Sequence, residues 1–177
     1  MKATARKWLF YESKKMTGNN PAKDRQAIIE VMNNYATGLD ARDWKLWRSV
    51  FADEVTFDLS SWNQVPARLL ETDRVVKSQA RIFAELKTTQ HFLTNHRITI
   101  EGDRARGIAH MRAEHWLLED DGTTSRYTMF GYYDDRFLRT DSGWKMYEMQ
   151  LNVTQTEGDR RVMDEAQRRA KARRQQP

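Results

Sequence analysis

The spacing of apolar residues changes partway along this 177-residue chain, and the change constrains the fold more than any other feature of the sequence. In the first half apolar side chains recur mainly at helical spacing, and in the second half they follow the alternation of strands. The expected helices cover residues 24–39, 44–51 and 71–86, and the expected strands cover 55–59 and four segments between 90 and 153. Helices followed by a run of strands predict an α+β fold, with the helices on one face of an antiparallel sheet.

Three turns that contain Asp and Gly separate the four later strands, and this chemistry is typical of hairpin connections. The turns lie at Glu101–Arg104, Glu119–Gly122 and Thr140–Gly143. Because the strands are long and the helices few, we expect the sheet to curl around the helices into a cone. A curled sheet capped by helices encloses one apolar pocket.

The composition excludes several classes of protein. The chain has no cysteine, which excludes a disulfide framework, a thiolate metal site and a cysteine nucleophile. No apolar run approaches the roughly 20 residues that cross a bilayer, and the patch Trp8–Tyr11 is too short for a secretory signal. We therefore expect a soluble, cytoplasmic protein of one domain, without a membrane partner.

The net charge of +5 comes from the two ends of the chain. Residues 1–24 hold six Lys or Arg against two acids, and residues 158–177 hold seven against three, so each end carries +4 and the segment between them −3. The last stretch lacks the aromatic side chains that a single-strand reader needs between its basic ones. We expect a basic N-terminal extension at 1–21, one domain at 22–157, and a solvated basic tail at 158–177 rather than a nucleic-acid arm.

Four histidines fall within 25 residues and raise the question of a zinc site: His91, His96, His110 and His115. Ligands on one face of a strand need an even spacing, whereas the close pairs here are five residues apart. We therefore expect no metal site, and we expect no other cofactor.

Asp40 stands at the C-terminal end of the first expected helix, where the helix dipole disfavours an anion. Such a carboxylate needs a partner, and a histidine is suited to this role because the carboxylate fixes the imidazole tautomer and stabilises imidazolium. A histidine that titrates near neutral pH can take a proton from carbon or oxygen. The alternative is that Asp40 caps the next helix, with Asp43 three residues further on.

Two further polar residues have both a structural and a functional interpretation. Tyr35 lies on the apolar stripe of the first helix, either as a core residue or with its hydroxyl directed into the pocket toward a leaving group. Asn95 is four residues from His91 and so shares its strand face. It either binds substrate or satisfies a neighbouring polar group.

Glu114 and His115 compete for one position in the pocket. With a two-residue turn between their strand and the one before it, Glu114 lies opposite His91 and faces the same side. Ile98 and Ile100, however, are apolar on the other parity of that strand, so both sets face inward only if a bulge separates them. Such a bulge directs His115 inward instead of Glu114.

The remaining candidates are aromatic and methionine side chains of the interior, which suit a flat, apolar substrate such as a phenolic compound, a steroid or a polyketide. They are Trp44, Phe57, Met111 and Met129, which are ordinary core residues in the alternative interpretation, and Trp62, in a loop at 60–68 that could close over the mouth of the cone. Arg139 is either a cation in the pocket or the exposed end of a strand.

A set of short motifs, in their order and spacing, resembles the SnoaL-like branch of the nuclear-transport-factor-2-like superfamily over residues 22–157. The motifs are Ile29–Tyr35, Gly38-Leu39-Asp40, Trp47, Phe51-Ala52-Asp53, Thr89–Asn95, Gly102–Ala105, Gly131-Tyr132-Tyr133 and Gly143–Met146. The resemblance implies a cone-shaped, curved antiparallel sheet around about three helices, a cystatin-like α+β barrel with its pocket between helices and sheet.

The resemblance also implies a cofactor-independent lyase or isomerase, since the family includes dehydratases, a dehydrochlorinase, cyclases and isomerases. Several members place an Asp at the end of the first helix and a His on the strand after the third, as Asp40 and His91 stand here, and one has a Tyr where Tyr35 stands. His91, oriented by Asp40, is then the general base, and Tyr35 is the acid or hydrogen-bond donor. Loss of water is the leading reaction, with retro-aldol cleavage and double-bond migration as variants.

Substrate-binding positions and a quaternary structure follow from the same resemblance. Relatives often carry a second pocket histidine, which favours His115 over Glu114, and one has a strand Gly followed eight residues later by an Arg, like Gly131 and Arg139. Relatives often pair their sheet faces, so we expect a homodimer or homotrimer that acts on a small apolar molecule. The alternative is a non-catalytic module of the same fold, such as a ligand-binding protein or the small subunit of an oxygenase.

Overall fold

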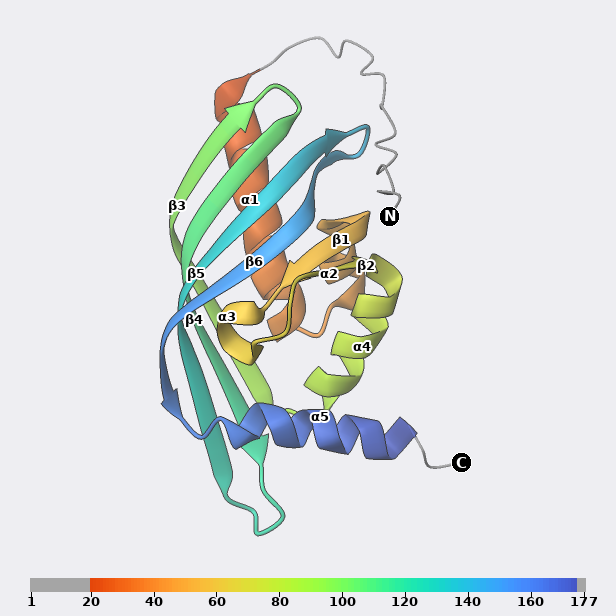
Figure 1. Cartoon of the computed structure of the whole chain (residues 1–177), viewed down its shortest axis with the longest axis vertical. Coiled ribbons are helices and arrows are strands. Elements are labelled where there is room, and N and C mark those ends of the chain that lie inside the picture. The colour runs from red at the N-terminus through yellow and green to blue at the C-terminus, as the bar shows by residue number, and fades with distance from the viewer. Residues whose placement is uncertain (1–19, 175–177) are drawn as a thin grey trace, which may run out of the picture.

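The computed structural model describes residues 20–174, which form five helices and six strands (Figure 1). The helices are α1 (Pro21–Asp40), α2 (Trp44–Ser49), α3 (Ser60–Asn63), α4 (Thr72–Ala84) and α5 (Arg161–Arg174). The strands are β1 (Phe51–Asp58), β2 (Arg68–Glu71), β3 (Thr88–Glu101), β4 (Arg104–Leu118), β5 (Thr124–Thr140) and β6 (Gly143–Gly158). Within this part of the chain, no helix is both long and apolar enough to cross a membrane.

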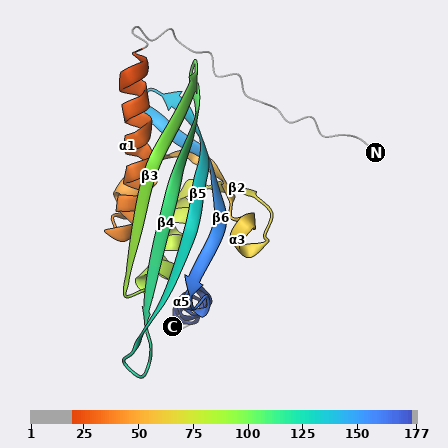
Figure 2. The ribbon, with the colours of Figure 1, turned by 90° about the vertical axis from the view of Figure 1, so that its left-hand side faces the viewer.

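One curved sheet, with its strands in the order β2-β1-β6-β5-β4-β3, forms the body of the fold. Neighbouring strands are antiparallel, except that β1 and β6 run parallel. The long strands β3–β6 bend together, and α1 packs along them in contact with β3 and β6 (Figures 1 and 2). The predicted α+β fold with a curved sheet is confirmed, with more short elements than the sequence pattern indicates.

The sequence of α1 explains where this helix begins and which face it buries. Asn20 caps it, because its side-chain oxygen accepts from the backbone N–H groups of Ala22 and Lys23. The helix begins at Pro21, a position where no N–H group is needed. Residues at spacings of three and four form one buried stripe toward the sheet: Ile28, Met32, Tyr35, Ala36 and Leu39.

Aromatic side chains fill the interior between α1, α2 and β1. The ring of Phe51 lies 4.9 Å from that of Trp47 and 5.5 Å from that of Phe57. Tyr35 joins this cluster from α1, with its ring 5.8 Å from Trp47. Tilted and edge-to-face contacts of this kind stabilise large rings beyond the effect of their burial. This level of the cone is therefore packed core.

β3 contains the bulge that the apolar pattern predicts. Its register with β4 shifts by one residue between Thr94 and Arg97, where Asn95 adopts a left-handed backbone conformation with φ of 56°. Because of this shift His91 and Ile98, which have opposite parity along the strand, both face the interior.

Two segments, 60–68 and 158–174, differ from expectation. The first is not a plain loop, because it contains α3 and leads into β2, on which Leu69 and Leu70 are exposed. The second is not a solvated tail, because α5 packs on α4, β4 and β5. Its buried residues recur at helical spacing: Val162, Met163, Ala166 and Ala170. Most of the expected N-terminal extension lies outside the described residues.

The structure corrects the expectation that Arg139 is a cation in the pocket. Its guanidinium donates to both carboxylate oxygens of Asp24, at 2.6 and 2.8 Å, and lies over the ring of Trp144. The indole N–H of Trp144 donates to the same carboxylate at 3.0 Å. Asp24 is in the first turn of α1 and Asp40 is its last residue, about 24 Å away along the helix axis. Arg139 therefore ties the end of β5 to the beginning of α1.

We predict that Asp24→Ala will lower the free energy of unfolding by about 1–3 kcal/mol, because it removes the shared acceptor of Arg139 and Trp144. Urea unfolding measures the change. Asp103→Ala is the matched control, since Asp103 also contacts Arg139, at 3.1 Å, but is exposed and should cost less than about 1 kcal/mol. Equal losses in the two variants would contradict the assignment.

Candidate active site

The end of α1 and the beginning of β3 bring Asp40 and His91 together. Nδ1 of His91 lies 2.6 Å from Oδ1 of Asp40, and the backbone N–H of His91 donates to Oδ2 at 2.6 Å. Two contacts from one residue fix the orientation of both side chains. Nε2 of His91 has no hydrogen-bond partner among residues 20–174.

Two residues that the sequence analysis does not single out complete the surroundings of the carboxylate. The hydroxyl of Thr89 donates to Oδ1 of Asp40 at 2.9 Å. Nη1 of Arg42 donates to the Thr89 hydroxyl at 2.8 Å and to the backbone carbonyl of Leu39 at 2.6 Å. The carboxylate is therefore linked through Thr89 to a cation at the end of α1.

These contacts decide the protonation state of Asp40. Burial raises the pKa of this carboxyl, but the hydrogen bonds and charge of His91 and the hydroxyl of Thr89 lower it by more, so the net shift is downward. Asp40 is ionised at neutral pH and accepts the Nδ1 proton of His91. Nε2 of a neutral His91 then carries the lone pair that a general base needs.

His115 lies beside the dyad on β4, with its ring centroid 5.4 Å from that of His91 and the two planes nearly perpendicular. Burial and the neighbouring His91 lower the pKa of His115 to about 3, although its ring hydrogen-bonds the backbone of Tyr127. His115 is therefore neutral at physiological pH, and its buried Nδ1 has no hydrogen-bond partner within the described chain. Glu114, the competing residue, faces the opposite side of the sheet, where it forms an ion pair with Arg112 and lies across from Thr128 on β5.

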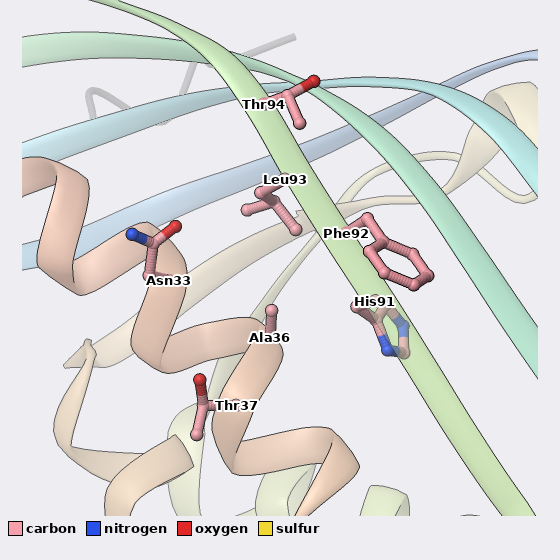
Figure 3. Close-up of a pocket in the computed structure, with 7 residues that line it drawn as sticks. All are labelled: Asn33, Ala36, Thr37, His91, Phe92, Leu93 and Thr94. Atoms are coloured by element: carbon pink, nitrogen blue, oxygen red, sulfur yellow. The ribbon is translucent and has the colours of Figure 1, made fainter.

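His91 lines a cleft of about 280 Å³ between α1 and β3 (Figure 3). One wall comes from α1 and the other from β3, and the lining residues are Asn33, Ala36, Thr37, His91, Phe92, Leu93 and Thr94. Asn33 and Thr37 are four residues apart on the exposed side of α1, so both present polar groups to the same opening. The side chain of His91 is 4% exposed, and this cleft lies next to it.

Tyr35 is buried, and its ring lies 5.4 Å from that of Tyr133, whose hydroxyl is its hydrogen-bond partner. Burial raises the pKa of Tyr35, and the nearby carboxyls of Asp135 and Asp40 raise it further. Burial also raises the pKa of Asp135 well above its ordinary value. Tyr35 is therefore protonated at neutral pH, and it is not part of the lining of the cleft.

The structure does not bring two of the predicted residues to the dyad. Asn95 is exposed at the bulge and contacts Nδ1 of His110 at 3.2 Å on the outer face, because the bulge breaks the alternation that would have kept it level with His91. Trp62 lies on α3, where Arg160 stacks on its ring.

The other predicted residues are core side chains at different distances from the dyad. Met111 and Met129 face the same side of the sheet as His91, and both are buried. Trp44 packs on Phe83, whose ring lies 6.1 Å from that of His115, whereas Phe57 belongs to the aromatic cluster near β1. Across the described residues no group of three or more His, Asp or Glu side chains is arranged to hold a metal ion.

The fold and the dyad define a class of protein: a conical α+β barrel with a carboxylate–histidine pair where its first helix ends. The sequence profile of the SnoaL-like domain matches residues 20–150, and the chain belongs to this family. Among functionally curated proteins, none matches the sequence significantly.

Solved structures share this fold. Kfla4162 from Kribbella flavida is 31% identical, with a TM-score of 0.77 over 82% of this chain and 99% of its own. A candidate aromatic ring hydroxylase from Novosphingobium aromaticivorans is 26% identical, with a TM-score of 0.70 over 81% and 99% of the two chains. A candidate scytalone dehydratase from the same organism is 19% identical, with a TM-score of 0.67 over 78% and 89%.

Some of the residues that the sequence analysis misses carry a signal in the sequence. Thr89 is two residues before His91 and so shares its strand face, and Asn33 and Thr37 lie at helical spacing beside the buried stripe of α1. Arg42 carries no such signal, because its position depends on a left-handed backbone conformation, with φ of 57°.

The lowered pKa of His115 predicts a pH-dependent contribution to stability. The unfolded chain protonates this residue near pH 6.5, whereas the folded chain does so only near pH 3. The contribution is therefore present above about pH 6.5 and is lost as the pH falls. We expect His115→Phe to gain stability relative to the unmodified protein, by up to about 1.4 kcal/mol per pH unit below pH 6.5.

Urea unfolding of both proteins at several pH values measures this difference. Asp135→Asn is the control of opposite sign, because the raised pKa of Asp135 stabilises the fold at low pH and that contribution is lost as the pH rises above its unfolded value near 3.8. A difference between His115→Phe and the unmodified protein that does not change with pH would show that His115 is not held neutral by the fold.

Proposed function

We propose that the protein is a cofactor-independent lyase or isomerase that uses His91 as a general base. The observation that carries this proposal is the 2.6 Å contact between Asp40 and Nδ1 of His91, with His91 lining a cleft. An ionised carboxylate on one ring nitrogen orients the imidazole and stabilises the imidazolium that forms when the other nitrogen accepts a proton.

In the elimination of water, Nε2 of His91 removes the proton from the carbon next to the one that bears a hydroxyl. The electrons of this C–H bond form the double bond as the C–O bond breaks. The imidazolium then gives its proton to the departing hydroxide, so water leaves and His91 is neutral again. In double-bond migration the proton returns to a different carbon as the electrons of the double bond shift. In retro-aldol cleavage the base deprotonates a hydroxyl, the C–C bond breaks as a C=O bond forms, and the imidazolium protonates the carbanion that is released.

Tyr35 and His115 act on substrate oxygen atoms in this proposal. Because its pKa is raised, Tyr35 keeps its proton. Its hydroxyl can donate a hydrogen bond to the departing oxygen of the substrate when its hydrogen bond to Tyr133 is broken. Nδ1 of His115, which is buried and unpartnered in the described chain, can accept from a substrate hydroxyl.

The proposed substrate is small and apolar, with an aromatic or polycyclic body. Ala36, Phe92 and Leu93 supply apolar surface in the cleft, while Asn33 and Thr37 supply hydrogen-bonding groups at its rim. The candidate aromatic ring hydroxylase among the solved structures supports an aromatic compound.

We predict that His91→Ala will lower turnover by about 10²–10⁴-fold, as expected for the loss of a positioned base, and that Asp40→Asn will lower it to a similar degree. The assay screens phenolic and steroid alcohols for formation of a double bond by absorbance and mass spectrometry. His110→Ala is the matched control, because His110 is exposed on the outer face and should keep full activity. Undiminished turnover by folded His91→Ala would remove the base from the mechanism.

A non-catalytic ligand-binding module is the second candidate, and the packed aromatic interior favours it. Trp47, Phe51 and Phe57 are buried where an enzyme of this shape would need space for substrate. The same screen distinguishes the two, because a binding module would bind an aromatic compound without product formation and with equal affinity in His91→Ala.

We also propose that the outer face of the sheet mediates self-association. Two side-chain atoms on this face are buried without a hydrogen-bond partner in the described chain: Oγ1 of Thr128 and Nδ2 of Asn152. Light scattering after size exclusion should give a dimer or trimer, and Phe130→Lys on this face should shift it toward monomer. Leu69→Lys, on exposed β2, should not. A monomeric unmodified protein would refute this proposal.

A further inference from the structure

Arg42 lies next to the dyad in a backbone conformation that non-glycine residues seldom adopt. With φ of 57°, the turn after α1 lets the Arg42 N–H donate to the Leu39 carbonyl, while the Arg42 carbonyl accepts from the N–H of Trp44. Its guanidinium returns over the end of the helix and stacks on the ring of Phe83, with 5.2 Å to the centroid. A strained backbone conformation that the surroundings hold in place beside a candidate site suggests that the side chain has a function there.

The hydrogen bonds of Arg42 determine where the hydroxyl proton of Thr89 points. A hydroxyl has one proton, and Oγ1 of Thr89 already accepts from Nη1 of Arg42 at 2.8 Å. Its own proton is therefore donated to Oδ1 of Asp40, at 2.9 Å. This is the same oxygen that contacts Nδ1 of His91, so Thr89 and His91 share one acceptor.

Two opposite charges act on the imidazoles of the site. The ionised Asp40 favours a protonated ring, and the cationic Arg42 favours a neutral one. Both effects are present at His115. The charge of Asp40 raises the pKa of His115, and the charge of Arg42 lowers it. Burial lowers the pKa of Arg42, but an arginine keeps its charge at neutral pH, and the negative end of the α1 dipole stabilises it.

We propose that Arg42 is a positioning residue that acts through Thr89. Together they draw part of the charge of Asp40 away from His91, so that the imidazole stays neutral and able to accept a proton. An ionised carboxylate favours the protonated form of its histidine partner, and sharing its charge with Thr89 and Arg42 weakens this effect. The inference rests on the base role of His91 in the proposed function, but its test needs no substrate.

The groups that face His91 come from three places. Asp40, whose charge also acts on Tyr35, belongs to α1, Arg42 to the turn after it, and His115 to β4. Tyr35 and His115 do not change charge near neutral pH, because burial raises the pKa of the first and lowers that of the second to about 3. A change in the titration of His91 in the variants below therefore reports on Asp40 and Arg42.

The test is an NMR titration of the His91 ring in the full ¹⁵N-labelled chain and in paired variants. Arg42→Met removes the charge and Arg42→Lys retains it, while Thr89→Val removes the hydroxyl and Thr89→Ser retains it. We expect the titration midpoint to rise by about 0.5–1 pH unit in Arg42→Met and by less in Thr89→Val, and to keep its original value in the two conservative variants. Arg48→Met, which removes a cation paired with other carboxylates, should leave it unchanged.

A midpoint that is the same in all variants, or that rises equally in Arg42→Met and Arg42→Lys, overturns the proposal. If Arg42→Met does not fold, the two Thr89 variants provide the test. An unchanged midpoint in Thr89→Val overturns the proposal, and a rise in Thr89→Val that is absent in Thr89→Ser supports the proposal. Failure of the proposed function gives a different result: either no product forms or His91→Ala keeps full activity, while the midpoints still shift as expected.

Discussion

The carboxylate of Asp40 lies at the negative end of the α1 dipole, and the structure around the candidate site follows from the need to stabilise an anion there. Three donors from β3 meet this need: the ring and the backbone N–H of His91 and the hydroxyl of Thr89. β3 is an edge strand, so alternate backbone N–H groups have no neighbouring strand to pair with. Asp40 accepts from one of these groups and so joins the helix to the sheet edge while it orients the imidazole.

The two imidazoles of the site differ in role because they differ in surroundings. His115 is buried beside aromatic rings, with no carboxylate partner among residues 20–174, and the fold keeps it neutral. His91 has a carboxylate partner and lines a cleft. The two neighbouring imidazoles can therefore have different roles: His91 can exchange protons, and His115 can only accept a hydrogen bond.

The sequence predicts the parts of this arrangement that depend on periodicity. The position of Asp40 at a helix end and the conflict of parity between His91 and Ile98 lead to the helix–strand contact and the bulge, and the structure contains both. Contacts between distant segments leave no such pattern. Arg139 meets Asp24 rather than the dyad because β5 ends beside the first turn of α1, and α5 packs on the sheet although its basic residues suggested a solvated tail. Spacing within one element does not reveal which distant element covers it.

The bulge in β3 links these local facts to the chemistry. Before the bulge, β3 directs His91 and Thr89 toward α1, and after it Ile98 packs in the core. The same strand therefore contributes to a polar site in its first part and to the apolar core in its second part. A regular strand would place one of these sets on the outer face and would direct Glu114 inward beside His91. A second carboxylate there would favour the imidazolium. The bulge places Ile98 in the core and Glu114 on the outer face, so Asp40 is the carboxylate that orients His91.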